Sequence, residues 1–195
     1  LFFNVNHTSR LLNNKIFDEG KISIQDPAGG LVVKLLDPQK NEIITDTCAA
    51  PGGKTSYISQ IMGNTGKIRA FDTNMNRLKK FARGMSRLKV DNVDAEKADM
   101  TVEKVTRSSK MLVDAPCTGT GVMSKRADLR WRRTIKNLYE LVKLQRDILF
   151  NVADFIKKDG VLVYSTCSME PEENWGVIDH FLQMNPNWQV ESAQK

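Results

Sequence analysis

The chain has 195 residues, of which 41% are hydrophobic and 27% are charged, and this is enough for one globular domain with a sizeable core. Its formal net charge of +6 and its isoelectric point near 9.2 favour a polyanionic partner. No apolar run approaches the roughly 18 residues needed to cross a bilayer, and no secretory signal pattern opens the chain. We therefore expect a soluble, intracellular protein without a membrane-spanning segment.

The cysteine content excludes two common kinds of stabilising site. The chain contains three cysteines, Cys48, Cys117 and Cys167, which is an odd number with no C-x-x-C spacing. A disulfide framework or a structural zinc site would need paired or clustered cysteines. We therefore expect reduced thiols, either buried or reactive, and no bound metal.

The beginning of the chain is predicted to be a separate lead-in segment. Residues 1–40 are expected to pack on the unit formed by residues 41–195. Within this segment, a turn at Asp26-Pro27 should lead into a short apolar helix that ends near Leu36.

From Glu42 on, short β-branched runs alternate with amphipathic stretches. This alternation predicts an α/β fold with a mostly parallel central sheet and helices packed on it. The expected strands are Ile43–Asp46, Lys67–Asp72, Lys110–Asp114 and Val161–Thr166, with a further, weakly marked strand before Asp99.

Two long amphipathic helices are expected between these strands. Apolar residues recur at helical spacing from Leu78 to Leu88, and again from Leu138 to Ile156. Gly160 follows the second helix and is expected to mark its end. Both helices should lie on the surface with one face in the core.

The residues that follow the strands are informative, because ligands of an open parallel sheet bind outside the carboxyl ends of its strands. The first strand leads into "DTCAAPGGKT", in which small residues let the backbone approach a ligand closely. The second strand ends at Asp72, where a carboxylate typically holds the ribose hydroxyls of an adenosine. Asp99 could cap an adenine amino group. Taken singly, a glycine-rich turn after a strand is often only a tight turn, and a strand-terminal aspartate more often caps a helix than binds a ribose.

The same glycine-rich turn is one residue away from a phosphate-binding loop, which leaves a nucleotide triphosphatase as a minor alternative. Such a loop would need glycine at position 48, ahead of "GKT". The chain has Cys48 there, and its side chain would obstruct the backbone cradle for phosphates.

Two further strand ends carry thiols. Asp114 and Cys117 follow the third marked strand in "DAPC", and Cys167 follows the fourth in "STCS". Neighbouring strands lie about 5 Å apart, so these groups could converge on one ligand, although cysteine often only packs. A thiolate that adds to carbon 6 of a cytosine makes carbon 5 nucleophilic, and an acid near N3 stabilises the charge. Such an attack needs an unpaired base and a thiol of lowered pKa.

Together, "DTCAAPGGKT", "DAPCTGTGV", "DLRW", "LQRDIL" and "YSTCSMEPEEN" resemble the RsmB/Sun family of S-adenosylmethionine-dependent RNA cytosine-5 methyltransferases. The resemblance covers about residues 25–174. It implies a Rossmann-like class I methyltransferase fold with helices on both faces of the sheet, and it makes residues 41–195 the catalytic domain. It also implies that S-adenosyl-L-methionine is the cofactor and that RNA, ribosomal RNA in particular, is the partner.

In that family the cysteine of the T-C-S motif is the nucleophile, so the resemblance implies that Cys167 attacks carbon 6 and that Cys117 assists product release. Asp114 would lie against the cytosine ring, and Lys54 would point toward the reaction centre. DNA cytosine-5 methyltransferases, in contrast, carry their nucleophile in the Pro-Cys motif. The implied cofactor-binding residues are Cys48, Ala49, Ala50, Pro51, Gly52, Gly53, Lys54, Asp72, Arg77, Asp99 and Asp114.

The stretch "KRADLRWRR" is predicted to contact RNA, because arginines around a tryptophan can bind phosphate and stack on an unpaired base. Without the neighbouring motifs, a solvated basic loop would be the preferred interpretation. "KRADLRW" is also similar to plant-type family members, which suggests a plastid as the alternative to the cytoplasm. The predicted RNA-binding residues are Lys125, Arg126, Arg130, Trp131 and Arg132.

The C-terminus differs from the family pattern. The family fold closes with an antiparallel hairpin, and the chain stops after what we expect to be its first strand, around Trp188 to Val190. The catalytic domain is thus predicted to be C-terminally incomplete, with one strand lacking a neighbour. An upstream RNA-binding domain, which family members often carry, is also missing from the sequence. The main alternative function is therefore a catalytically idle fragment that binds cofactor and RNA and acts in assembly.

Overall fold

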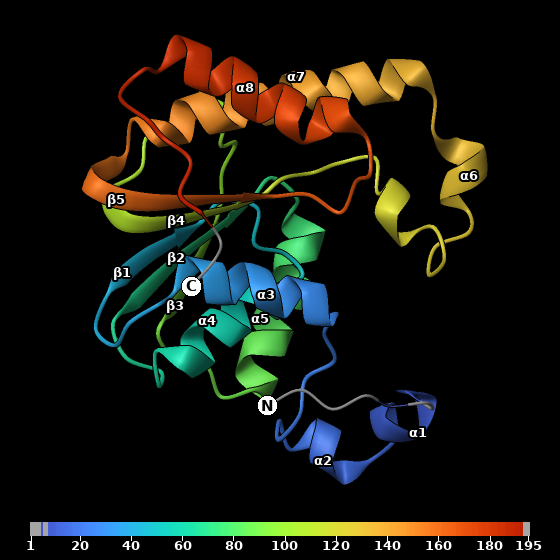
Figure 1. The fold of residues 1–195 in the computed structure, drawn as a ribbon. Coiled ribbons are helices and arrows are strands. Elements are labelled where there is room, and N and C mark those ends of the chain that lie inside the picture. The colour runs from blue at the N-terminus through green and yellow to red at the C-terminus, as the bar shows by residue number, and fades with distance from the viewer. Residues whose placement is uncertain (1–4, 6–7, 193–195) are drawn as a thin grey trace.

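The computed structural model describes residue 5 and residues 8–192, and its centre is a five-stranded parallel sheet (Figure 1). The strands are ordered β3-β2-β1-β4-β5, so the chain starts in the middle, moves to one edge and then crosses to the other. This confirms the predicted parallel α/β architecture. The strands are β1 (Ile43–Asp46), β2 (Lys67–Asp72), β3 (Val93–Lys97), β4 (Ser108–Asp114) and β5 (Ile156–Ser165).

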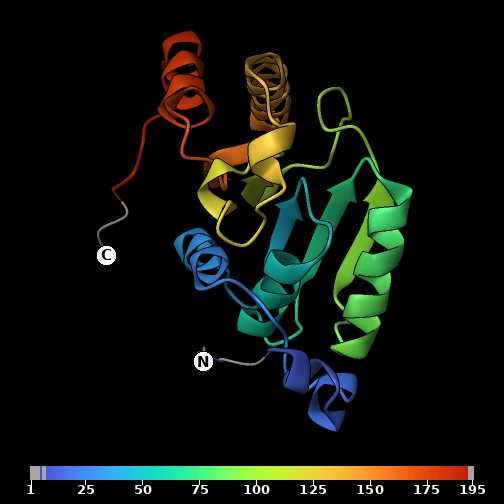
Figure 2. The same cartoon turned by 90° about the vertical axis from the view of Figure 1, so that its right-hand side faces the viewer.

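Helices cover both faces of the sheet, as predicted. Figures 1 and 2 show α3, α4 and α5 on one side of the sheet and α7 and α8 on the other. The α-helices are α1 (Thr8–Leu12), α2 (Lys15–Asp18), α3 (Pro27–Leu36), α4 (Gly53–Ile61), α5 (Met75–Arg87), α6 (Leu129–Arg132), α7 (Ile135–Ala153) and α8 (Trp175–Met184). Two 3-10 turns, η1 (Thr120–Val122) and η2 (Pro171–Glu173), lie in the loops after β4 and β5.

The core is divided between the two faces because side chains alternate along each strand. On β4, Leu112 packs with the apolar residues of α3 and α4, whereas Met111 and Val113 pack with those of α7. All three side chains are fully buried. The sheet is therefore a rigid platform on which the turns after its strands are displayed.

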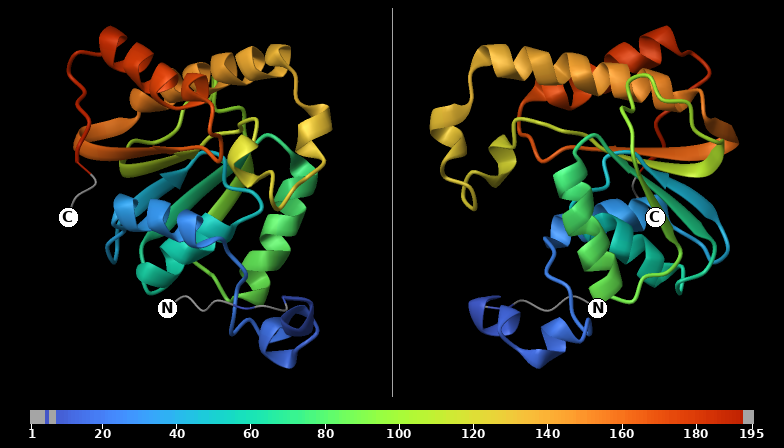
Figure 3. Two further views of the ribbon diagram at one scale, coloured as in Figure 1. Left: turned by 45° about the vertical axis from the view of Figure 1, so that its right-hand side comes forward. Right: turned by 180° about the vertical axis from the view of Figure 1, so that it is seen from behind.

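The N-terminal helices α1 and α2 lie at the end of the molecule opposite α7 and α8 (Figure 3). The guanidinium of Arg87, at the end of α5, stacks 3.7 Å above the centre of the Phe17 ring and donates to the carbonyl oxygen of Ile22 at 3.0 Å. The helix predicted to end near Leu36 is α3, which begins after Asp26, whose carboxylate accepts from the amide of Ala28 at 3.0 Å. Residues 1–4, 6–7 and 193–195 of the two predicted segments lie outside the described residues.

The predicted end of the long helix is wrong. A capping box at Thr134 and Asn137 starts α7, but the helix stops at Ala153 and Ile156 already belongs to β5. Gly160 lies inside β5, where a Cβ atom would be 2.7 Å from the carbonyl oxygen of Ser109. The apolar pattern of the helix runs directly into that of the strand, and periodicity cannot separate the two.

The strand expected at Trp188 to Val190 is also absent, since these residues form no strand in the structure. Trp188 instead packs edge-on against Phe181 of α8, with the ring centroids 5.4 Å apart. Within residues 8–192, β5 therefore has β4 as its one neighbour, as expected without a closing strand. None of the helices in this range is long and apolar enough to cross a membrane.

Candidate functional site

The candidate site lies at the carboxyl edge of the sheet, where polar side chains end four neighbouring strands. β1, β2 and β4 end on aspartates, at Asp46, Asp72 and Asp114, and β5 ends at Ser165. Because all these strands run parallel, the turns that follow them share one edge. The segment between β4 and α7, which includes α6, lies at this same end of the molecule (Figure 2).

The glycine-rich turn after β1 is held close to the end of β2. The amide of Ala49 donates to the carbonyl oxygen of Phe71 at 2.8 Å, and the peptide between Ala50 and Pro51 is cis. Gly52 has a φ of 107°, and a Cβ atom there would lie 2.7 Å from Met85 and 2.9 Å from Phe81. A side chain here would be strained by the positive φ and would displace Met85 and Phe81, so the turn into α4 favours glycine.

Cys48 fits the packing interpretation of a thiol. Its side chain packs against the buried cluster between the sheet and α7. Burial raises the pKa of the Cys48 thiol to about 12, so it stays protonated. Cys48 is therefore a packing residue of the turn and not a nucleophile.

Asp72 has a buried carboxylate oxygen that accepts no hydrogen bond among the described residues. The side chain is 3% exposed, and its Oδ1 accepts from the amide of Asn74 at 2.8 Å. Its Oδ2 has no hydrogen-bond partner among the described residues, although the Nη1 of Arg77 lies 3.2 Å away. Arg77 also donates to the carbonyl oxygen of Ala50 and so ties α5 to the glycine-rich turn. A buried carboxylate oxygen that accepts no hydrogen bond and is neutralised by one arginine fits the hydroxyls of a ribose.

Asp99 lies just beyond β3 and is exposed. The preceding residue, Ala98, donates its amide to the carbonyl oxygen of Asp72 at 3.3 Å, which places this turn next to the end of β2. The Oδ1 of Asp99 accepts from the amide and the hydroxyl of Thr101, and these bonds lower the pKa of the carboxyl. The adenine contact predicted for Asp99 stays a prediction.

Asp114 is held by two donors from different elements. The Nζ of Lys54, at the start of α4, lies 2.6 Å from Asp114 Oδ2, and the hydroxyl of Ser165 donates to Oδ1 at 2.8 Å. All three side chains are only partly buried. The structure thus brings together Lys54 and Asp114, which were predicted separately, and it adds Ser165, which the sequence analysis did not single out.

The two thiols predicted to converge lie in direct contact. The Sγ atoms of Cys117 and Cys167 are 3.2 Å apart, and the amide of Cys167 points at the Sγ of Cys117 at 3.3 Å. The hydrogen bond from Cys117, assisted by the charge of Lys54, lowers the pKa of Cys167 to about 7, against burial and Asp114. The same bond, together with burial, raises the pKa of Cys117. Cys167 is the exposed member of the pair, and these shifts favour the thiolate on Cys167 and the proton on Cys117.

Asp46 is a further strand-end carboxylate at this edge that the sequence analysis did not single out. It is 1% exposed and accepts from the hydroxyl of Thr55 at 2.7 Å. Burial raises the pKa of its carboxyl to about 7. Its position at a strand end, like those of Asp72 and Asp114, was the available signal.

The predicted RNA-binding residues lie on an exposed surface next to the thiols. Trp131 is 89% exposed, and the four basic residues predicted with it are exposed as well. Leu129 of α6 packs near Gly119, which in turn lies beside the Sγ of Cys167. Arg133, which was not among the predicted residues, anchors the segment by donating to the carbonyl oxygen of Thr118 at 2.8 Å. RNA contacts of this surface stay a prediction.

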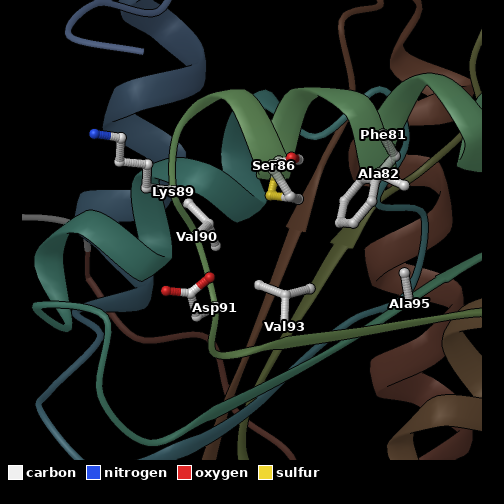
Figure 4. Close-up of a pocket in the computed structure, with 9 residues that line it drawn as sticks. Phe81, Ala82, Ser86, Lys89, Val90, Asp91, Val93 and Ala95 are labelled. Atoms are coloured by element: carbon white, nitrogen blue, oxygen red, sulfur yellow. The ribbon is translucent and has the colours of Figure 1, made fainter. Parts of the chain in front are cut away.

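A separate hollow of about 550 Å³ lies between α5 and β3 (Figure 4). Val93 at its floor starts β3, so the hollow faces the amino end of that strand and not the carboxyl edge. No thiol lines it, and its one carboxylate is Asp91. It is not part of the candidate site. Within residue 5 and residues 8–192 there is also no group of three or more His, Cys, Asp or Glu side chains arranged to hold a metal.

Comparison with known proteins gives consistent matches. Residues 33–195 match the family described as 16S rRNA methyltransferase RsmB/F. The probable ribosomal RNA small subunit methyltransferase B of Synechocystis is 40% identical over 182 residues, which cover 90% of this chain and 40% of that protein. The corresponding protein of Bacillus subtilis is 37% identical over 178 residues, 89% of this chain and again 40% of its own length. The chain thus spans about two fifths of these relatives.

Solved structures show the same similarity. NSun6 from Pyrococcus horikoshii, solved with SFG, an analogue of S-adenosylmethionine, superposes with a TM-score of 0.83 at 34% identity. The match covers 89% of this chain and 45% of that one. The fold is therefore that of the Rossmann-like class I methyltransferases, as the sequence predicted.

Proposed function

The chain belongs to the 16S rRNA methyltransferase RsmB/F family, and on that premise we propose that it methylates carbon 5 of a cytosine in RNA. Ribosomal RNA of the small subunit is the proposed substrate, S-adenosyl-L-methionine the cofactor, and Cys167 the nucleophile. The observation that carries the proposal is the contact of 3.2 Å between the Sγ atoms of Cys117 and Cys167. The ion pair of Lys54 and Asp114 at the neighbouring strand end adds to it.

The cofactor is proposed to occupy the turn between β1 and α4 and the end of β2. Asp72 Oδ2 is the buried acceptor that would bind the ribose hydroxyls, and Arg77 would hold that carboxylate in place. Asp99 would bind the adenine amino group. The bound cofactor supplies a methyl group on a positively charged sulfur, which a carbon nucleophile can take.

The two thiols divide the reaction between them. The Cys167 thiolate forms a bond to carbon 6 of the cytosine, and the electron pair displaced toward N3 is neutralised by a proton that the Lys54–Asp114 pair donates to N3, which leaves carbon 5 nucleophilic. After methylation, carbon 5 must lose its proton and the bond between Cys167 and carbon 6 must break. Once Cys167 is bonded to carbon, the hydrogen bond that keeps Cys117 protonated no longer exists, and the Cys117 thiol loses its own proton to solvent. The Cys117 thiolate then takes the proton from carbon 5. The electron pair of that C–H bond forms the double bond between carbons 5 and 6, the Cys167 thiolate leaves, and N3 returns its proton.

The basic segment that includes α6 is proposed to hold the RNA strand. Its exposed Trp131 would stack on an unpaired base, and the surrounding arginines would bind phosphates. Because α6 follows the loop that carries Cys117, a base held there is close to both thiols.

The test uses methyl-labelled S-adenosylmethionine and unmodified small-subunit ribosomal RNA with three proteins: the chain, Cys167→Ala and Cys117→Ala. RNA label and protein-RNA adducts are scored on a denaturing gel. We expect label with the unaltered chain, no label or adduct with Cys167→Ala, and a persistent adduct with Cys117→Ala. Binding of cofactor and RNA without label or adduct would refute the proposal and identify the chain as the catalytically idle fragment.

A further inference from the structure

Two motifs of the sequence, "LQRDIL" and "EPEEN", have no part in the proposed chemistry, yet they meet beneath the thiols. Gln145 of the first motif and Glu173 of the second are both 0% exposed. The Nε2 of Gln145 donates to Glu173 Oε1 at 2.9 Å. Burying a carboxylate destabilises the fold unless hydrogen-bond donors surround it, so the donors around Glu173 indicate what it does.

Glu173 accepts hydrogen bonds from the residue that follows Cys117. The amide of Thr118 donates to both oxygens of the carboxylate, at 2.9 and 3.2 Å, and the hydroxyl of Thr118 donates to Oε2. Gln145 also donates to the carbonyl oxygen of Pro116 at 2.9 Å, on the other side of Cys117. The backbone before and after Cys117 is thus fixed by one buried pair of side chains.

The next residue, Asn174, fixes the loop that carries Cys167. Its Oδ1 accepts from the hydroxyl of Thr166 at 2.6 Å. Its Nδ2 donates to the carbonyl oxygens of Ser168 at 3.1 Å and Glu170 at 2.9 Å. Two consecutive residues therefore hold the two thiol loops, which come from different strands.

We infer that Glu173 is a positioning residue that sets the distance between the two catalytic thiols, with Gln145 and Asn174 as its partners. Glu173 acts through the Cys117 loop and does not touch the site itself. The inference rests on the roles proposed above for Cys167 and Cys117. The carboxylate suits this position because all its neighbours are donors: the amide and hydroxyl of Thr118 and the amide group of Gln145.

The test is Glu173→Gln, which keeps the size of the side chain but turns its amide group toward at least one of these donors. The Cys117 loop is then expected to move away from Cys167, and the variant should retain covalent protein-RNA adduct as Cys117→Ala does. Glu172→Gln, at an exposed position one residue earlier, is the matched control and should release its product normally. A simple loss of stability would lower adduct and label together, in proportion to the folded fraction, and this result would overturn the inference.

A second readout needs no RNA. Cys167 is alkylated with iodoacetamide over a range of pH, and the pH of half-maximal rate is expected near 7 in the unaltered chain and closer to the ordinary value of 9.0 in Glu173→Gln. Lys54 and Asp114, the charged groups that also face Cys167, are unchanged in this variant. If Glu173→Gln does not fold, Thr118→Val takes its place in the test. It removes the hydroxyl that donates to Glu173 Oε2 and that also contacts Ser168 Oγ at 3.1 Å, and it should shift the midpoint in the same direction.

The two readouts separate the possible failures. If Cys117→Ala forms no adduct, the proposed two-thiol reaction is wrong, and the alkylation midpoint still decides the positioning role. If Cys117→Ala traps the adduct while Glu173→Gln releases product and keeps the midpoint near 7, the inference is overturned.

Discussion

The neighbouring Cys117 thiol makes the largest contribution to the ionisation of Cys167, and this contribution can be measured. The hydrogen bond from Cys117 is the largest cause of the lowered pKa of Cys167, which is about 7 against an ordinary 9.0. Cys117→Ala removes this donor. Cys117→Ser keeps a donor of similar size and is the matched control. We expect the alkylation midpoint of Cys167 to rise toward 9.0 in the alanine variant and to stay lower in the serine variant.

The size of the expected change in alkylation rate follows from the fraction of Cys167 that is ionised. At pH 7 a thiol of pKa 7 is half ionised, and a thiol of pKa 9 is ionised to about 1%, which is a loss of about 50-fold. A more basic thiolate is also a better nucleophile. With a Brønsted coefficient of about 0.4 to 0.5, a rise of two pK units increases the rate constant of the thiolate roughly sixfold to tenfold. The alkylation rate at pH 7 should therefore fall about fivefold to eightfold. Above pH 10, where both thiols are ionised, the rate in the alanine variant should be roughly sixfold to tenfold higher.

The assay is a pH series of iodoacetamide labelling followed by peptide mass spectrometry, which reads each cysteine separately. Cys48 provides an internal standard, because burial raises its pKa to about 12 and its labelling should stay slow throughout. The direction of the shift is the critical result. If the midpoint of Cys167 is the same in Cys117→Ala and in the unaltered chain, the hydrogen bond does not set the ionisation, and Lys54 would have to do so alone.

Three further predictions concern the cofactor turn and the strand ends. The unfolded Asp46 is ionised above about pH 4 while the folded one keeps its proton up to about pH 7, so stability should fall as pH rises through this window. Asp46→Asn should reduce that fall in melting temperature measured at pH 5 and 7.5, and an equally steep fall would contradict the burial argument. Gly52→Ala should cost about 1–3 kcal/mol in urea unfolding, since φ is 107° and the added Cβ meets Met85; an unchanged midpoint would show that the turn adapts. Asp72→Asn should weaken binding of S-adenosylmethionine about tenfold to 100-fold in calorimetry, the worth of a hydrogen bond to a charged acceptor, and equal affinity would remove Asp72 from the cofactor site.

The parts of the site that lie at strand ends could be predicted from the sequence. In a parallel sheet the carboxyl ends share one edge, so reading Asp114, Cys117 and Cys167 as strand-end residues was enough to bring them together. The same rule was available for Asp46 and Ser165, which end β1 and β5 and were overlooked. Register within a sheet therefore predicts proximity without any knowledge of side-chain contacts.

The supporting contacts could not be predicted in this way. Glu173 bonds to Thr118 across 55 residues of sequence, and nothing in "EPEEN" shows that one glutamate is buried and its neighbour exposed. The predicted boundary between α7 and β5 was wrong for a related reason. Ile156 continues the apolar pattern of the helix, although it pairs with Ser108 of β4. Both outcomes depend on tertiary packing, which overrides local pattern.

The assignment of the nucleophile depends on where the one shared proton resides. In a pair of thiols 3.2 Å apart, a single hydrogen bond favours one thiolate and one thiol, so the two cysteines cannot both attack. Cys167 is exposed and close enough to Lys54 to feel its charge, whereas Cys117 is half-buried and fixed on both sides by the Gln145–Glu173 pair. The reverse assignment, with Cys117 as the attacking thiolate, would place the charge on the more buried sulfur and leave the exposed one protonated. Burial disfavours that state, and it opposes the amide of Cys167, which points at Cys117 Sγ and would stabilise a thiolate there. Together with the charge of Lys54, this favours Cys167 as the nucleophile independently of the family to which the chain belongs.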